Sequence, residues 1–258
     1  MDHVSSADGT SIAYETRGAG PAVVIVNGAF GTAKDAAAVA GALEDAGFLA
    51  VAYDRRARGE SGDTRPFAPE REAEDLAAVL AAVGGGAVLG HSSGAVLTLF
   101  AASLGVPIEH LFLSEPPFRF GEDEPADDLA ERLQAFVDEG RPGDAVTTFQ
   151  LEGVGLPPQL VEQIKAGPDF PALEQVAQSV VYDTTLVHDV STPTAAMLAV
   201  AAPVTVLSGA ETFAFLRANA ERLAGLIGGA EFVEVPESVG HRLDPVATTR
   251  VITERLRG

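Results

Sequence analysis

Cysteine is absent from the 258 residues of the chain. Without it the protein cannot form disulfides, use a thiolate as a nucleophile, or bind zinc or iron through sulfur. Its five histidines are scattered along the sequence. They offer few ligands for a metal site.

Basic residues are also scarce, since 17 lysines and arginines stand against 37 acidic residues and give a formal charge of −20 at pH 7. No basic stripe remains to neutralise phosphates, so a nucleic-acid or anionic-membrane partner is not expected. No run approaches the ~20 apolar residues of a membrane span, and the first residues do not resemble a secretory signal. These absences predict a cytoplasmic protein that acts on a small molecule, and they leave its oligomeric state open.

Apolar residues make up 47% of the chain, which is enough to build a substantial core. Short aliphatic segments alternate with helical stretches, and the segment 22–26 is apolar at every position, as in a strand covered on both faces. This alternation predicts a mostly parallel sheet with helices on both faces. The expected strands are 4–6, 11–16, 22–26, 48–53, 86–89, 110–114, 203–207 and 231–235, and the expected helices are 35–46, 70–83, 94–104, 219–227 and 245–256.

One block, residues 121–194, has no strand signal and contains only helical pieces interrupted by prolines and glycines. The clearest pieces are 126–139, 157–166 and 172–180. A helical insertion in an α/β sheet most simply forms a cap over one edge of the sheet. The sequence therefore predicts a core of residues 1–120 and 195–258 with a helical cap, or lid, of residues 121–194.

The clearest indication of catalytic chemistry is the pentapeptide Gly-His-Ser-Ser-Gly at 90–94, which follows an expected apolar strand and begins an expected helix. A serine in the pattern Gly-x-Ser-x-Gly lies on a tight turn with its hydroxyl directed away from the sheet, and the glycines remove Cβ atoms that would clash. The new helix places amide donors beside the hydroxyl. We interpret Ser92 as a nucleophile and the amide of Ser93 as an oxyanion donor.

A serine nucleophile needs a base from another loop at the same edge of the sheet. His241 follows the expected strand 231–235 and precedes the last helix. It therefore stands last in the chain order serine, acid, histidine. This position favours His241 as the base, whereas His91 lies inside the tight turn and is expected to support it.

Four segments together resemble the α/β-hydrolase superfamily across essentially the whole chain, and in particular its small single-domain bacterial members. They are the pentapeptide at 90–94, the loop 26–31, the Asp-Arg-rich turn 54–62 and the pair 240–241. The resemblance implies a twisted, mostly parallel sheet of eight strands, and it implies that the amide of Ala29 is a second oxyanion donor. The family usually has histidine where this chain has Asn27, a difference expected to alter loop geometry or pocket polarity while leaving a backbone donor in place. The turn 54–61 is expected to be an ion-paired structural turn.

The triad acid is where the chain departs from the family, because Thr212 stands where an aspartate is usual. Glu211 is one residue early, and a one-residue slip turns a side chain toward a different face. Glu115 ends the apolar strand 110–114, which in this fold lies about 4.8 Å from the strand that ends at Ser92. The run Glu-Pro-Pro-Phe that begins there also resembles a group of bacterial homologues without the usual aspartate. We therefore favour Glu115 as the acid and keep Glu211 as the alternative.

These assignments predict a serine hydrolase that uses a Ser-His-Glu triad and an acyl-enzyme intermediate, with no metal and no organic cofactor. Aromatic residues of the expected cap suggest a small, partly hydrophobic ester, lactone or thioester as substrate. Acyl transfer, perhydrolysis or C–C bond hydrolysis by the same triad, and a non-catalytic module that binds a small ligand, are the alternatives. The candidate pocket residues are Asn27, Phe30, His91, Phe118 and Tyr182.

Overall fold

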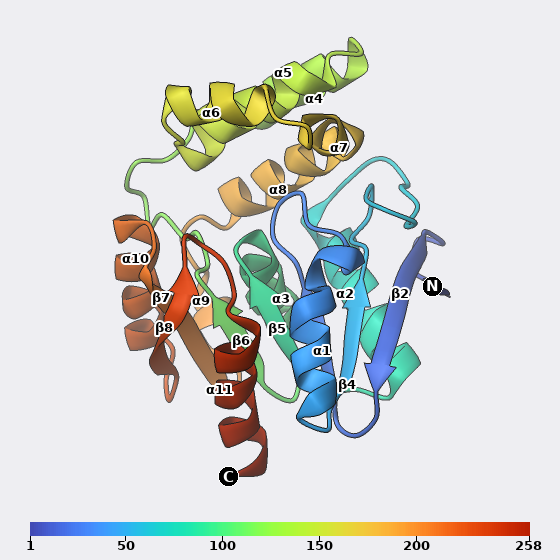
Figure 1. Cartoon of the computed structure of the whole chain (residues 1–258), viewed down its shortest axis with the longest axis vertical. Coiled ribbons are helices and arrows are strands. Elements are labelled where there is room, and N and C mark those ends of the chain that lie inside the picture. Colours follow the sequence, from blue (N-terminus) through green and yellow to red (C-terminus); the bar gives the residue numbers. More distant parts are fainter.

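The computed structural model describes residues 1–258 and contains one sheet of eight strands with helices on both faces (Figure 1). The strand order is β1-β2-β4-β3-β5-β6-β7-β8. The pairs β1–β2 and β2–β4 are antiparallel, and all the others are parallel. The strands are β1 (Asp2–Ser5), β2 (Ser11–Gly18), β3 (Ala22–Val26), β4 (Leu49–Tyr53), β5 (Ala87–His91), β6 (Leu111–Ser114), β7 (Val204–Glu211) and β8 (Glu231–Val239).

The centre of the sheet is buried because its strands carry apolar side chains on both faces. Every residue of β3 and β6 is buried. Parallel strands of this kind need crossover connections, and their carboxyl ends meet at one edge of the sheet. The last residue of β5, His91, pairs with Ser114 at the end of β6, and Ser114 pairs with Leu207 of β7. Residues that follow these strands are thus brought together although they are far apart in the sequence.

Helices cover each face of the sheet with the apolar stripe that their 3.6-residue period creates. On one face lie α1 (Ala37–Asp45), which follows the short turn η1 (Ala33–Ala36), and the C-terminal helix α11 (Pro245–Arg257). On the other face lie α2 (Pro69–Val83), α3 (Ser93–Ser103), α9 (Ala195–Leu198) and α10 (Ala214–Leu226).

The helices from residue 129 to residue 189, in the connection between β6 and β7, form a separate layer above the carboxyl edge of the sheet (Figure 1). We refer to this layer, residues 129–189, as the cap helices. They have an apolar cluster of their own, and α8 also contributes Leu186 to the core on the sheet. The elements are α4 (Leu129–Asp138), α5 (Pro142–Thr148), the π-helix η2 (Phe149–Val154), α6 (Pro158–Lys165), α7 (Phe170–Gln175) and α8 (Ala177–Asp189).

This architecture confirms the predicted fold class, and several element boundaries differ from the predicted ones. Helix α10 begins at Ala214 rather than at residue 219, and the predicted helix 172–180 is divided between α7 and α8. Strands β7 and β8 are longer than predicted, because a bulge between Gly209 and Glu211 lets their pairing continue past the sheet edge. None of the helices combines the length and the apolar character that a membrane crossing requires.

Candidate active site

Ser92 occupies a sharp turn between β5 and α3, with φ 54° and ψ −126°, a backbone conformation that residues other than glycine rarely adopt. The flanking glycines make the turn possible. A Cβ atom at Gly90 would lie 2.6 Å from the Cα atom of Ala95, and one at Gly94 would lie 2.1 Å from the carbonyl oxygen of Val26. The strained turn holds Ser92 at the wall of a pocket between the sheet edge and the cap helices.

His241 and Glu115 meet at this edge. His241 follows β8, and its Nδ1–H donates a hydrogen bond to Oε2 of Glu115. Glu115 follows β6 and is only 3% exposed. Its two carboxylate oxygens also accept hydrogen bonds of 2.8 Å from the amide of Gly209 and 2.9 Å from the hydroxyl of Thr212. Both carboxylate oxygens therefore have hydrogen-bond donors, as a buried carboxylate requires.

The electrostatics of this pair keep the carboxylate charged. Burial by itself raises the pKa of Glu115, but the hydrogen bonds from His241 and Gly209 outweigh burial and leave the pKa below its ordinary value. The alternative acid, Glu211, is exposed at the end of β7, and only its backbone carbonyl bonds to this loop, through the amide of Gly240 at 2.8 Å. Of the two acids that the sequence left open, the structure brings Glu115 to His241.

The amides of Ala29 and Ser93 lie at the same pocket, and neither donates a hydrogen bond within the protein. The loop after β3 can come this close because Gly28 has no side chain, since a Cβ atom there would lie 2.7 Å from Cβ of Ser92. The Asn27 side chain bonds within its own loop, donating to the carbonyl of Thr32 at 2.6 Å. Replacement of the family histidine by asparagine thus leaves two free amides at the pocket.

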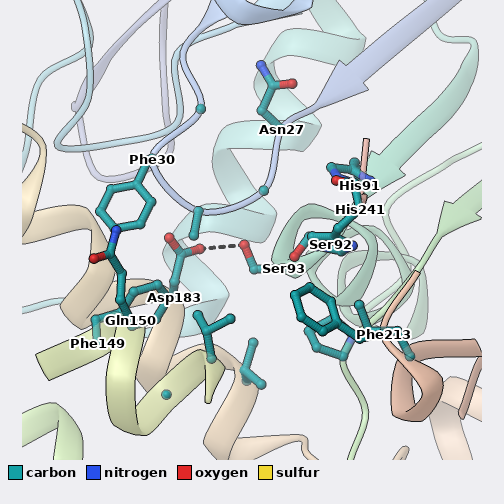
Figure 2. Close-up of a pocket in the computed structure, with 18 of the residues that line it drawn as sticks. Asn27, Phe30, His91, Ser92, Ser93, Phe149, Gln150, Asp183, Phe213 and His241 are labelled. Carbon is teal, nitrogen blue, oxygen red and sulfur yellow. Dashed lines mark hydrogen bonds between the residues drawn. The ribbon is translucent and has the colours of Figure 1, made fainter. Parts of the chain in front are cut away.

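Asp183, a fully buried residue of α8, was not predicted from the sequence. It connects the cap helices to the two segments that carry these amides. Its carboxylate accepts a 2.7 Å hydrogen bond from the Ser93 hydroxyl (Figure 2) and forms ion pairs of 2.8 Å with Arg55 and 2.7 Å with Arg58. Arg58 in turn donates to the carbonyl of Gly28 at 2.6 Å. The one signal in the sequence is an acidic residue in the middle of a helical segment, with apolar residues at Val180 and Leu186 one turn to either side of it.

The charges of this network compensate one another. Arg55 forms a second ion pair, of 2.7 Å, with the buried Glu72 of α2. Burial raises the pKa of Asp183, but the charges of Arg55 and Arg58 outweigh burial and lower it, so the carboxylate is ionised. The arginines of the turn 54–61 therefore have the ion-paired structural role that the sequence predicts.

His91 supports the loop that carries His241. Its Nε2–H donates to the His241 carbonyl at 3.2 Å, and its Nδ1 accepts from the Ser114 hydroxyl at 3.3 Å. The two imidazole rings lie 4.7 Å apart, centroid to centroid. Burial, together with the charge of His241, lowers the pKa of His91 to about 3, so His91 is neutral at pH 7.

Two of the candidate pocket residues are wrong. Phe118 is completely buried in the core on the sheet, and Tyr182 stacks on Phe67 at 3.9 Å while its hydroxyl donates to Asp63. Neither lines the pocket. Tyr182 precedes Asp183 on α8 and projects about 100° away from it around the helix, which turns the ring toward Phe67 and away from the pocket.

The pocket itself is a cavity of about 860 Å³ between the sheet edge and the cap helices. Asn27, Phe30, His91 and His241 contribute to its wall, as does Ser92 (Figure 2). No three carboxylate or imidazole side chains come together as ligands for a metal ion. The apolar side chains of the wall include Phe30, Phe149, Val154, Leu156, Val187, Phe213 and Leu216.

Residues 23–250 match the model of the alpha/beta hydrolase family, and the chain belongs to that family. An α/β hydrolase from Sphaerobacter thermophilus is 43% identical in sequence, with a TM-score of 0.91, over 99% of this chain and all of the other. No curated protein sequence matches the chain.

Two more distant structures share the fold. A hydrolase from Pseudomonas aeruginosa is 24% identical with a TM-score of 0.75, over 100% of this chain and 98% of the other. A thermophilic esterase from Thermogutta terrifontis is 23% identical with a TM-score of 0.72, over 99% of this chain and 97% of the other.

Proposed function

We propose that the protein is a serine hydrolase of small, partly hydrophobic esters, lactones or thioesters, with Ser92 as nucleophile, His241 as base and Glu115 as acid. The observation that carries this proposal is the hydrogen bond between His241 and the buried, ionised carboxylate of Glu115, at the pocket that Ser92 also lines. A carboxylate in this position fixes the ring tautomer with a proton on Nδ1 and leaves Nε2 free to accept a proton.

In the first half of the reaction, Oγ of Ser92 attacks the substrate carbonyl carbon while Nε2 of His241 takes its proton. The amides of Ala29 and Ser93 stabilise the negative oxygen of the tetrahedral intermediate, and each such donor contributes about 3 to 4 kcal/mol to the transition state. The C–O or C–S bond to the leaving group then breaks, and the proton on His241 passes to the leaving alkoxide or thiolate. The product is an acyl-enzyme on Ser92.

In the second half, a water molecule gives a proton to His241 and attacks the acyl carbon. Collapse of the intermediate releases the carboxylic acid, and His241 returns its proton to Ser92. Throughout, the negative charge of Glu115 stabilises the imidazolium that forms on His241. The apolar wall of the pocket fits a partly hydrophobic substrate.

A fluorophosphonate probe and a series of short-chain p-nitrophenyl esters test the proposal. We expect the probe to attach to Ser92, as located by mass spectrometry, and Ser92→Ala to abolish both labelling and turnover. His241→Ala is expected to do nearly the same. His3→Ala is the matched control, because His3 is exposed on β1 and does not line the pocket, so this variant retains turnover. A wild-type protein that neither reacts with the probe nor hydrolyses any of these esters contradicts the proposal.

A further inference from the structure

Gln150 is the unexplained polar group of the pocket. It belongs to the π-helix η2, is 4% exposed and lines the pocket. Its carboxamide makes no hydrogen bond, and Oε1 is buried without any partner. Figure 2 shows the carboxamide extending from η2 toward Phe30. A polar group buried in this way loses its hydrogen bonds to water and gains none in return, so a native protein retains it only for a reason.

Gln150 is unique among the unpartnered groups in facing the pocket. Six buried side-chain atoms lack a hydrogen-bond partner, and only the one that belongs to Gln150 comes from a residue of the pocket wall. The other five are Ser6 Oγ, Tyr53 Oη, Arg58 Nε, Thr248 Oγ1 and Thr249 Oγ1.

Two other buried polar residues of the cap helices, Asp183 and Thr184, line the pocket, and the side chains of both already have hydrogen-bond partners. Both carboxylate oxygens of Asp183 accept hydrogen bonds, from Ser93, Arg55 and Arg58, and the hydroxyl of Thr184 donates to the carbonyl of Val180 at 2.7 Å. Of the three, only Gln150 has a side-chain oxygen without any partner.

The backbone holds Gln150 in this position. Its carbonyl accepts a 2.9 Å hydrogen bond from the amide of Leu156, which closes the end of η2 at the left-handed Gly155. On the preceding residue, the ring of Phe149 packs edge-on against Phe30, with centroids 5.5 Å apart. π-helices are rare and are frequent at functional sites, where the extra residue per turn redirects a side chain.

The chemistry of the carboxamide and of the wall defines the group it would bind. The unpartnered Oε1 needs a hydrogen-bond donor, which excludes a substrate carboxylate at this point. An ammonium group would be buried without a counter-charge, because the one buried acid of the wall, Asp183, is compensated by Arg55 and Arg58, and the other acids of the wall, Asp35, Glu124 and Asp127, are exposed. A hydroxyl or an amide N–H remains, and the oxygen of either group can accept from Nε2 of Gln150 in return.

We propose that Gln150 recognises a neutral hydrogen-bond donor, a hydroxyl or an amide N–H, on the substrate. The substrate is then a bifunctional molecule, with an ester-type carbonyl at Ser92 and a neutral polar group separated from it by an apolar spacer. This inference rests on the proposed function, because it concerns the same pocket. Apolar pockets with a few well-placed polar groups use those groups to select and orient their ligands.

Matched pairs of substrates test the inference. One series consists of p-nitrophenyl alkanoates of graded chain length with and without a terminal hydroxyl. A second series places the same hydroxyl on the alcohol side, as monoesters of alkanediols compared with esters of alkanols, and is followed by acid release. For one chain length we expect the wild type to prefer the hydroxylated member by about tenfold in kcat/KM, the effect of one neutral hydrogen bond.

Gln150→Met removes the carboxamide with little change in shape. We expect it to abolish the preference by raising KM for the hydroxylated substrate, and to leave the reaction of Ser92 with a fluorophosphonate unchanged. The variant is also expected to unfold at the same or a higher temperature, since it removes an unpartnered polar group from an apolar wall. Gln163→Met, on the exposed face of α6, is the matched control and retains the preference.

The inference is overturned if the wild type shows no preference at any chain length in either series, or if Gln150→Met keeps the preference. A loss of thermal stability in Gln150→Met would also contradict it, because the side chain would then have a structural partner. Failure of the proposed function is recognised separately: in that case the wild type does not react with the fluorophosphonate at all.

Discussion

The hydroxyl of Thr212 donates a 2.9 Å hydrogen bond to Oε2 of Glu115, the same carboxylate oxygen that binds the ring of His241. Thr212 occupies the position at which the resemblance to the family leads one to expect the triad aspartate. The residue at the usual acid position thus holds the carboxylate that has moved to the neighbouring strand. Because β6 and β7 are adjacent, the shift of the acid from one strand to the other keeps it beside the histidine loop.

Glu115→Gln is the first test of this arrangement. The substitution removes the charge that stabilises the imidazolium of His241, and it no longer fixes the ring proton on Nδ1. We therefore expect kcat for a p-nitrophenyl ester to fall by about two orders of magnitude or more. The matched control is Glu211→Gln, an exposed carboxamide at the end of β7, which retains wild-type kcat. Equal and mild effects of the two substitutions would show that Glu115 is not the triad acid.

Thr212 itself gives a second prediction. Thr212→Val preserves the shape of the side chain but removes the hydroxyl that donates to Glu115, and we expect kcat to decrease by about three- to tenfold, the effect of one hydrogen bond. Thr212→Ser retains the hydroxyl and is expected to restore most of kcat. Steady-state kinetics of the two variants on one ester decide the matter, and a serine variant as slow as the valine variant would show that the hydroxyl has no part in the effect.

The buried ion pairs of Asp183 predict a large effect on stability. Asp183→Asn leaves Arg58 without its carboxylate partner, and we expect the free energy of unfolding, measured in urea, to decrease by about 3 to 5 kcal/mol. Glu237→Gln breaks the exposed ion pair with Arg250 and is the control, with an expected change below about 1 kcal/mol.

Ser93→Ala separates the role of this network in positioning from its role in stability. The substitution removes the hydroxyl that bonds to Asp183 but keeps the backbone amide at the pocket. If the network positions that amide, kcat decreases while KM changes little, because the oxyanion is bound in the transition state and not in the ground state. An unchanged kcat would restrict the network to a structural role.

His91 predicts how stability depends on pH. Its pKa is about 3 in the folded protein against 6.5 for the free side chain, so between these values the unfolded chain binds a proton that the folded chain does not. Stability therefore decreases as the pH falls from 6.5 toward 3. Between pH 6.5 and 5 the contribution of His91 adds to that of His110, whose pKa burial also lowers, whereas Glu115 and Asp183, whose pKa values are lowered, take up protons only at lower pH.

His91→Gln provides the test, since glutamine can still donate to the carbonyl of His241 but does not titrate. We expect the free energy of unfolding of this variant, measured in urea at several pH values, to depend less steeply on pH between 6.5 and 5 than in the wild type. Gln163→Met, which replaces an exposed side chain of α6 that does not titrate, is the control and keeps the wild-type slope. An identical slope in His91→Gln would mean that His91 accepts a proton in the folded protein as readily as in the unfolded chain.

The features that follow from local sequence could be predicted. The alternation of aliphatic and helical segments defines a mostly parallel sheet, because such strands need helical crossovers. The tight turn at Ser92 could be predicted from its two glycines together with the apolar strand before them and the helix after them, although the close contact at Gly94 is with Val26 of the neighbouring strand. His241 could be placed at the same edge because it follows a strand.

Other features were decided only by the tertiary structure. They depend on the register of paired strands and on the face of a strand or helix that a residue occupies. The choice between Glu115 and Glu211 required the pairing of β6 with β7 and the bulge after Gly209, since a one-residue shift reverses the direction of a side chain. Phe118 and Tyr182 are aromatic like Phe30, and composition cannot distinguish a residue that faces the core from one that faces a pocket. Asp183 and Gln150 meet the site only through the packing of the cap helices. Composition and local order thus determined the fold and the position of Ser92, whereas long-range packing brought Glu115 to His241 and shaped the pocket.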